Sequence, residues 1–107
     1  MNTKKEYERI VNLIQNNVEN FIATFKKTPM EIVLPESIVL FLKESHKSYF
    51  MLDDDIDELT FENLSVKSVR DKVANNKGYL YRYSFNWQFD MNVEESMEFD
   101  IGGNNEH

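Results

Sequence analysis

The sequence predicts an α+β domain of two layers, in which a long N-terminal helix and a short second helix pack on an antiparallel sheet of about four strands. Two patterns carry this prediction: an apolar stripe at helical spacing over the first 25 residues, and alternation of large and polar residues towards the other end. The expected element order is α-β-α-β-β-β. A chain of 107 residues has room for one core, so residues 1–101 are expected to form a single domain and residues 102–107 a flexible tail.

The first helix is predicted to run from Thr3 towards the Thr28-Pro29 pair. Thr3 and Glu6 have capping-box spacing, and a residue before proline is pushed away from helical geometry. Between these points apolar residues recur at steps of three and four, which gives the helix one face to dock on a sheet. These residues are Tyr7, Ile10, Val11, Ile14, Val18, Phe21, Ile22 and Phe25.

The middle of the chain predicts a short strand followed by a short helix. Met30 to Leu34 is extended and apolar, and Pro35 suits the first position of a helix that ends near His46 or Lys47. Tyr49 to Leu52 fits either a continuation of this helix or a new strand. Residues 59–66 alternate with a slip in phase, which indicates a strand with a bulge or tight bend, and residues 72–78 have the composition of a turn.

The most regular pattern lies in residues 79–91, where a large side chain occupies every second position. It predicts one long strand with an aromatic face and a polar face. Stacking on nucleic-acid bases would need basic neighbours, and this strand holds only Arg82, so the aromatic face is expected to cover the first helix. The face consists of Tyr79, Tyr81, Tyr83, Phe85, Trp87, Phe89 and Met91. Met97 to Ile101 alternates again and predicts a final strand.

The net charge of −7 is unevenly distributed. Residues 1–52 hold seven basic and six acidic residues, whereas residues 53–107 hold five and thirteen. An acidic chain repels polyphosphate, so a basic protein is the expected partner and direct nucleic-acid binding is not. Acidity that only keeps a small domain soluble is the alternative. No cysteine is present, no apolar run is long enough to span a bilayer, and no leader-like segment opens the chain, so a cytoplasmic location is expected.

Two acidic clusters are the candidate partner-binding residues. The first is Asp53, Asp54, Asp55, Asp57 and Glu58, and the second is Glu94, Glu95 and Glu98, flanked by Asp90 and Asp100. The first cluster begins like an EF-hand calcium loop, but Glu58 stands where that loop needs glycine and Leu64 where it needs a bidentate glutamate. A solvated loop is therefore expected, with a weak cation site as the alternative, and no metal or cofactor is assigned.

No catalytic constellation is recognisable. His46 has no nucleophile or carboxylate at a familiar spacing, and a histidine near the end of a helix is explained by the helix dipole. With only three glycines in the chain, a glycine-rich phosphate loop is absent. The chain is therefore predicted not to be an enzyme.

The stretch Lys26 to Glu44 (KKTPMEIVLPESIVLFLKE) resembles a pattern in small phage and prophage proteins of AT-rich bacteria. Those proteins open with an amphipathic helix, a proline-led strand and a short helix, and the resemblance transfers no functional residue. The function expected is that of an acidic binding protein, of the immunity or anti-defence type, that inhibits a basic nucleic-acid-processing protein. The alternative is a phage-derived structural or assembly protein that acts by self-association through its first helix or edge strands.

Overall fold

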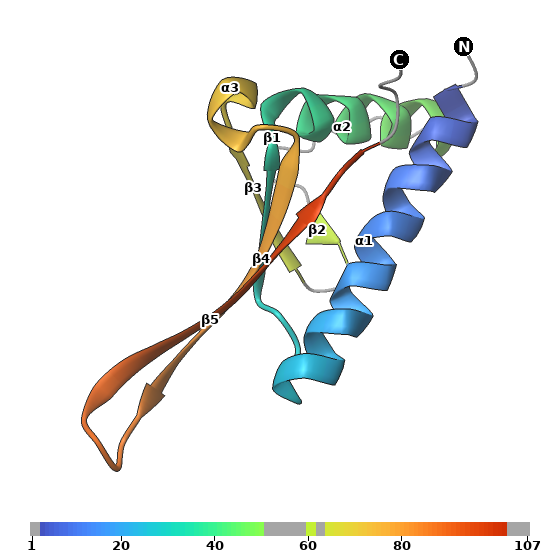
Figure 1. Cartoon of the computed structure of the whole chain (residues 1–107). Coiled ribbons are helices and arrows are strands. Elements are labelled where there is room, and N and C mark those ends of the chain that lie inside the picture. The colour runs from blue at the N-terminus through green and yellow to red at the C-terminus, as the bar shows by residue number, and fades with distance from the viewer. Residues whose placement is uncertain (1–2, 51–59, 62–63, 103–107) are drawn as a thin grey trace.

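The computed structural model describes residues 3–50, 60–61 and 64–102 and confirms the predicted α+β class (Figure 1). The predicted order of helices and strands is present, with a two-residue strand and a one-turn helix added to it. The elements are α1 (Thr3–Phe25), β1 (Glu31–Pro35), α2 (Glu36–Phe50), β2 (Thr60–Phe61), β3 (Leu64–Val69), α3 (Asp71–Ala74), β4 (Lys77–Asn86) and β5 (Met91–Asp100).

Helix α1 has the predicted start and ends three residues before Thr28. Lys26 follows it with a left-handed φ of 61° and donates its backbone N–H to the carbonyl of Ile22 at 2.8 Å, which closes the last turn. Near the other end, Arg9 forms an ion pair with Glu6 at 2.8 Å and donates a hydrogen bond to the backbone carbonyl of Ile101 at 2.9 Å. This arginine therefore joins α1 to the chain just beyond β5.

Helix α2 continues past His46 and Lys47 to Phe50, so Tyr49 and Phe50 follow the predicted alternative of a continued helix and not that of a new strand. Its start is stabilised from a distant part of the sequence: Asp71, the first residue of α3, accepts a hydrogen bond from the backbone N–H of Ser37 at 2.9 Å. Hydrogen bonds from the side chain and the backbone of Ser37 lower the pKa of the Asp71 carboxyl group. The backbone hydrogen bond also satisfies one of the amides that every helix leaves unpaired in its first turn.

The sheet is mixed, so the prediction of a purely antiparallel sheet was wrong. Its strand order is β2-β3-β1-β4-β5, and β1 and β3 are parallel, with Ile32 opposite Val66. The other neighbouring strands are antiparallel. The physical reason is the position of α2: it lies between β1 and β3 in the chain, and a helical crossover lets the chain re-enter the sheet in the same direction.

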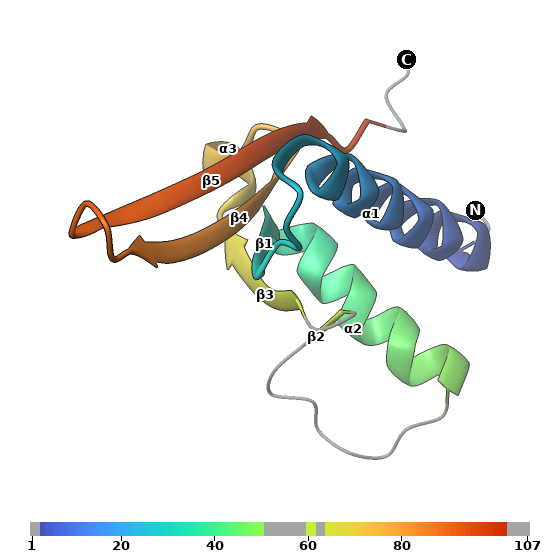
Figure 2. The ribbon, with the colours of Figure 1, turned by 90° about the horizontal axis from the view of Figure 1, so that it is seen from below.

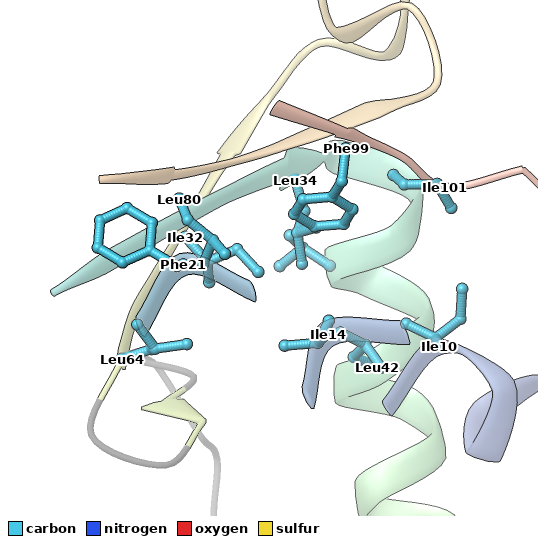
Figure 3. Packing of buried hydrophobic residues seen from close by; sticks show 11 residues of the cluster. Ile10, Ile14, Phe21, Ile32, Leu34, Leu42, Leu64, Leu80, Phe99 and Ile101 are labelled. Atoms are coloured by element: carbon cyan, nitrogen blue, oxygen red, sulfur yellow. The ribbon is translucent and has the colours of Figure 1, made fainter. Parts of the chain in front are cut away.

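Helices α1 and α2 lie on the same side of the sheet, as Figure 2 shows. Between them and the sheet is a single apolar cluster, part of which is seen in Figure 3. Its buried members are Ile10, Ile14, Phe21, Ile32, Leu34, Val39, Leu42, Leu64, Leu80, Phe99 and Ile101. Side chains of this kind each contribute about 1.5–3 kcal/mol when fully buried, so this cluster is the main source of stability.

Strands β4 and β5 form a hairpin that projects beyond the rest of the molecule (Figure 1). The prediction of one strand over residues 79–91 was therefore wrong, because the chain turns back at Trp87–Asp90. The side-chain oxygen of Asn86 accepts the backbone N–H groups of Gln88 (3.0 Å) and Phe89 (3.2 Å), and Asp90 has a left-handed φ of 51°. An asparagine that bonds the backbone in this way favours a turn over a continuing strand.

The aromatic side chains of β4 do not cover α1, so the expectation that they pack on this helix was wrong. Leu80 is completely buried and lies opposite Ile32 of β1, so this side of β4 faces the helices. Tyr79 and Tyr81 lie opposite Val33 and Glu31, on the other side of the sheet. No helix among the described residues covers that second side (Figure 2). Alternation identifies two faces of a strand but does not say which one is covered.

Candidate functional site

The uncovered side of the hairpin carries a row of aromatic rings, which we call the aromatic face: Tyr79, Tyr81, Tyr83 and Phe85. The ring centroids of Tyr79 and Tyr81 are 6.4 Å apart, and those of Tyr81 and Tyr83 are 5.9 Å apart with planes only 9° from parallel. Tyr79 and Tyr81 are half-buried, whereas Tyr83 and Phe85 are exposed. The three tyrosine rings therefore form a stacked row whose outer end, with Phe85 beyond it, is accessible to a partner.

Carboxylates border the aromatic face. In β5, Glu94 lies directly opposite Tyr83 and Glu98 opposite Tyr79, while in β1 Glu31 lies opposite Tyr81. Residues opposite one another in a sheet project from the same side. The arrangement thus combines flat aromatic rings with negative charge on one surface.

The tyrosine hydroxyl groups respond to this environment. Burial raises the pKa of Tyr81, and Glu94, Tyr79 and Glu31 raise it further. Burial also raises the pKa of Tyr83, with Glu31 and Glu94 adding to the effect. Both phenols are consequently kept protonated, as hydrogen-bond donors, over a wider pH range than a free tyrosine.

The tip of the hairpin exposes three large apolar side chains. Trp87 is 86% exposed, Phe89 66% and Met91 53%, and we call these three residues the hairpin tip. The ring of Phe85 contacts that of Trp87 edge-on, with centroids 4.6 Å apart, so Trp87 continues the aromatic face. Large apolar side chains held in water on an ordered turn are typical of an interaction surface.

Positive charge is almost absent from the hairpin. Between residues 79 and 98 the single cation is Arg82, on the helix side, where its guanidinium donates to the carbonyl of Thr28 at 2.9 Å. At the base of the hairpin, Lys77 pairs with Asp100 at 2.7 Å and lies 4.0 Å from Glu98. Neither cation is placed to hold a phosphate over the outer rings, so the aromatic face lacks what a single-strand nucleic-acid site needs.

The predicted acidic residues are divided by the structure. Glu94 and Glu98 border the aromatic face, whereas Glu95 projects to the helix side, where its side chain is 17% exposed and lies 3.6 Å from the Lys27 ammonium group. The first cluster, Asp53, Asp54, Asp55, Asp57 and Glu58, lies outside the described residues. The second cluster was predicted as one group of partner-binding carboxylates, and strand alternation separates Glu95 from Glu94 and Glu98.

Sequence reasoning missed the aromatic residues as a functional surface. The pattern of Tyr79 to Met91 identified the strand, but Trp87 and Phe89 were placed in its continuation. A signal for the turn was available in Asn86, a residue that favours turns, followed four positions later by Asp90, which tolerates a left-handed φ. That signal was masked because the large residues keep their two-residue spacing through the turn.

Within the described ranges, no group of three or more His, Cys, Asp or Glu side chains is arranged to hold a metal ion. None of the helices in the same ranges is long and apolar enough to cross a membrane. The candidate site consists of aromatic rings and carboxylates on a projecting arm. No protein-family model, curated protein or solved structure matches this chain.

Proposed function

We propose that this chain is a non-enzymatic binding protein that recognises a basic protein through the aromatic face and the hairpin tip. The partner we propose is a nucleic-acid-processing protein, which the chain would inhibit by occupying its basic surface. A single observation carries the proposal: the outer hairpin exposes Tyr83, Phe85, Trp87 and Phe89 on an arm that no helix among the described residues covers.

Energetics support a binding role for the arm. The outer part of the hairpin is a two-stranded ribbon, because β1 pairs with β4 only as far as Tyr81. Such a ribbon is marginally stable in water on its own. Tyrosine and tryptophan are also the residues that most often dominate binding energy at protein interfaces. An arm that costs stability and exposes these residues is best explained by a partner that covers them.

Charge supports a basic partner. Arginine stacks on aromatic rings through cation–π contacts and pairs with carboxylates, so one arginine can use Tyr83 and Glu94 together. The acidic run from Asp53 to Glu58 contributes to the overall charge of −7, which would accelerate encounter with a positive surface. Association should therefore be fast at low salt and weaken as salt is raised.

Self-association is the second candidate, and the exposed hairpin tip is the observation that favours it. Two tips could bury Trp87 and Phe89 against each other. The same contact would bring together two chains of charge −7, each with Glu94 and Glu98 beside its rings. Sedimentation across a range of protein concentrations separates the two candidates, because a monomer at every concentration excludes self-association.

The test is capture of partners from native lysate of the source organism or its host across a salt gradient. We expect the wild-type chain to retain a basic protein that is released as salt rises. Replacing Trp87→Ser and Phe89→Ser together should weaken retention by more than tenfold, on the order of the loss expected for interface aromatic residues. Val73→Ser is the matched control, because Val73 is equally apolar and 71% exposed but belongs to α3.

Each result has a definite meaning. Equal retention of the same protein by the tip variant and by the Val73→Ser control would contradict the proposed surface. Retention that does not fall with salt would contradict the basic partner. Thermal unfolding of all variants should agree closely, because exposed side chains contribute little to the folded state.

A further inference from the structure

Strand β5 leaves one long edge of the sheet unpaired. In the strand order, β4 lies on one side of β5 and no strand of the described residues lies on the other. All ten residues from Met91 to Asp100 pair with β4 in continuous register. An edge of this length exposes a row of backbone donors and acceptors that another chain can pair with.

The hydrogen bonds at the base of the hairpin identify which amides point outward. Ile101 donates its backbone N–H to the carbonyl of Asn76 at 3.0 Å, on the β4 side. Hydrogen-bonded and non-hydrogen-bonded pairs alternate in an antiparallel ladder, so the odd-numbered residues of β5 bond β4 and the even-numbered ones direct N–H and C=O away from it. In agreement, the backbone carbonyl of Tyr81 accepts a hydrogen bond from the backbone N–H of Met30 at 2.7 Å, on the β1 side. Tyr81 lies opposite Ser96, so these two residues are not hydrogen-bonded to each other.

The outward-pointing backbone groups belong to the residues whose side chains border the aromatic face. They are Asn92, Glu94, Ser96, Glu98 and Asp100. An added strand would place alternate side chains beside Glu94 and Glu98, where Lys or Arg would be favoured. Its intervening side chains would lie beside Val93 and Met97, which are half-buried on the helix side and favour apolar neighbours.

We propose that the free edge of β5 receives an extended segment of the basic partner as an additional strand, in which Lys or Arg alternates with apolar residues. This inference rests on the proposed function and specifies how the partner is held. Backbone hydrogen bonds to Glu94, Ser96 and Glu98 would supply affinity, and the carboxylates of Glu94 and Glu98 would select positive side chains.

A second copy of the chain is a poor occupant of this edge. Two β5 strands paired antiparallel about Ser96 would place Glu94 of each copy opposite Glu98 of the other. Like charges opposite one another in a ladder are destabilising, and charged residues on edge strands are a common protection against self-pairing. The charges of β5 therefore oppose self-pairing and favour a basic strand.

The test uses amide hydrogen exchange of the full chain with two synthetic probes, a short peptide of alternating Lys and Val and a matched peptide of alternating Glu and Val. The Lys–Val peptide should slow exchange at Glu94, Ser96 and Glu98, and the Glu–Val peptide should not. Glu95 and Met97 should change little, since their amides already bond β4. Protection at Tyr83 and Phe85 instead would place the added strand on β4 and overturn the proposal.

Ser96→Pro removes one outward amide from the centre of the edge. This substitution should weaken binding of the Lys–Val peptide on the order of tenfold or more. Proline has no backbone N–H to donate, and its ring obstructs an adjoining strand. The fold should persist, since the Ser96 amide does not bond β4 and proline is accepted on edge strands. Ser96→Ala, which keeps the amide, is the control, and equal binding by the two variants would overturn the proposal.

The same variants separate this inference from the proposed function. Partner capture that requires Trp87 and Phe89 but is unchanged by Ser96→Pro would leave the proposed function standing and exclude strand addition. Capture unaffected by either change would contradict both. If Ser96→Pro does not fold, the exchange pattern of the wild-type chain with the two peptides still decides the question.

Discussion

Gly78 shows how a single residue fixes the side of β4 that is buried. It lies opposite Phe99 of β5, and a Cβ atom at this position would overlap the phenyl ring, with ring carbons at 2.8 and 2.9 Å. In the turn predicted over residues 72–78, Asn75 and Asn76 take left-handed φ values of 52° and 59°, whereas Gly78 does not have a positive φ. Gly78 instead provides space for the ring of Phe99, which is 7% exposed.

Gly78→Ala should therefore destabilise the fold by about 1–3 kcal/mol, the usual cost of adding a methyl group to a well-packed region. Urea denaturation of the variant measures this. The matching background is Phe99→Leu, in which the ring that meets the new methyl group is absent. In a double-mutant cycle, Gly78→Ala should lower the free energy of unfolding by less in the Phe99→Leu variant than in the wild type. An equal cost in both would show that the ring is not the obstacle.

At the scale of elements, the hairpin places aromatic residues of one strand beside acidic residues of the other. β4 supplies the tyrosines and β5 the carboxylates, and the register places Glu94 opposite Tyr83. Because burial and the neighbouring carboxylates raise the tyrosine pKa values, folding favours the protonated phenols. Their contribution to stability is complete below the pKa of an unfolded tyrosine, about 10, and is lost as pH rises through the higher folded values.

Glu94→Gln should lower the pKa of Tyr81 and Tyr83, since it removes a negative charge that opposes phenolate formation. Spectrophotometric titration of tyrosine absorbance in alkaline solution measures this directly. Glu95→Gln is the control, because Glu95 faces the helix side and pairs with Lys27. A titration curve that is the same for Glu94→Gln and the wild type would contradict the register of β4 and β5 or the position of the carboxylate.

The elements differ in how far the sequence predicts them. α1 was predicted well because one stripe of apolar residues, including Ile10, Ile14 and Phe21, both forms the helix and marks its buried face. β4 was not, because the side with more large residues is the uncovered one and Leu80 alone carries the buried side into the core. The parallel pairing of β1 with β3 depends on where α2 packs, which local patterns do not contain.

At the scale of the whole molecule, the apolar core and the proposed binding surface are separated in space. The apolar cluster lies where the helices meet the sheet, and the hairpin extends away from it, giving principal extents of 51 × 37 × 25 Å. Charge asymmetry in the sequence predicted an acidic surface in the second half, and Glu94 and Glu98 do border the candidate site. The aromatic component of that site follows only from the arrangement of helices on the other side of the sheet.

The proposed function requires that the aromatic side chains of the hairpin are exposed in the folded chain. Trp87 is the single tryptophan, so its fluorescence reports on the hairpin tip without ambiguity. At 86% exposure we expect emission like that of tryptophan in water, efficient quenching by acrylamide, and almost no change in wavelength on unfolding in urea. Emission at shorter wavelength, protected from acrylamide and shifting on unfolding in dilute solution, would contradict the account by placing Trp87 in a buried contact.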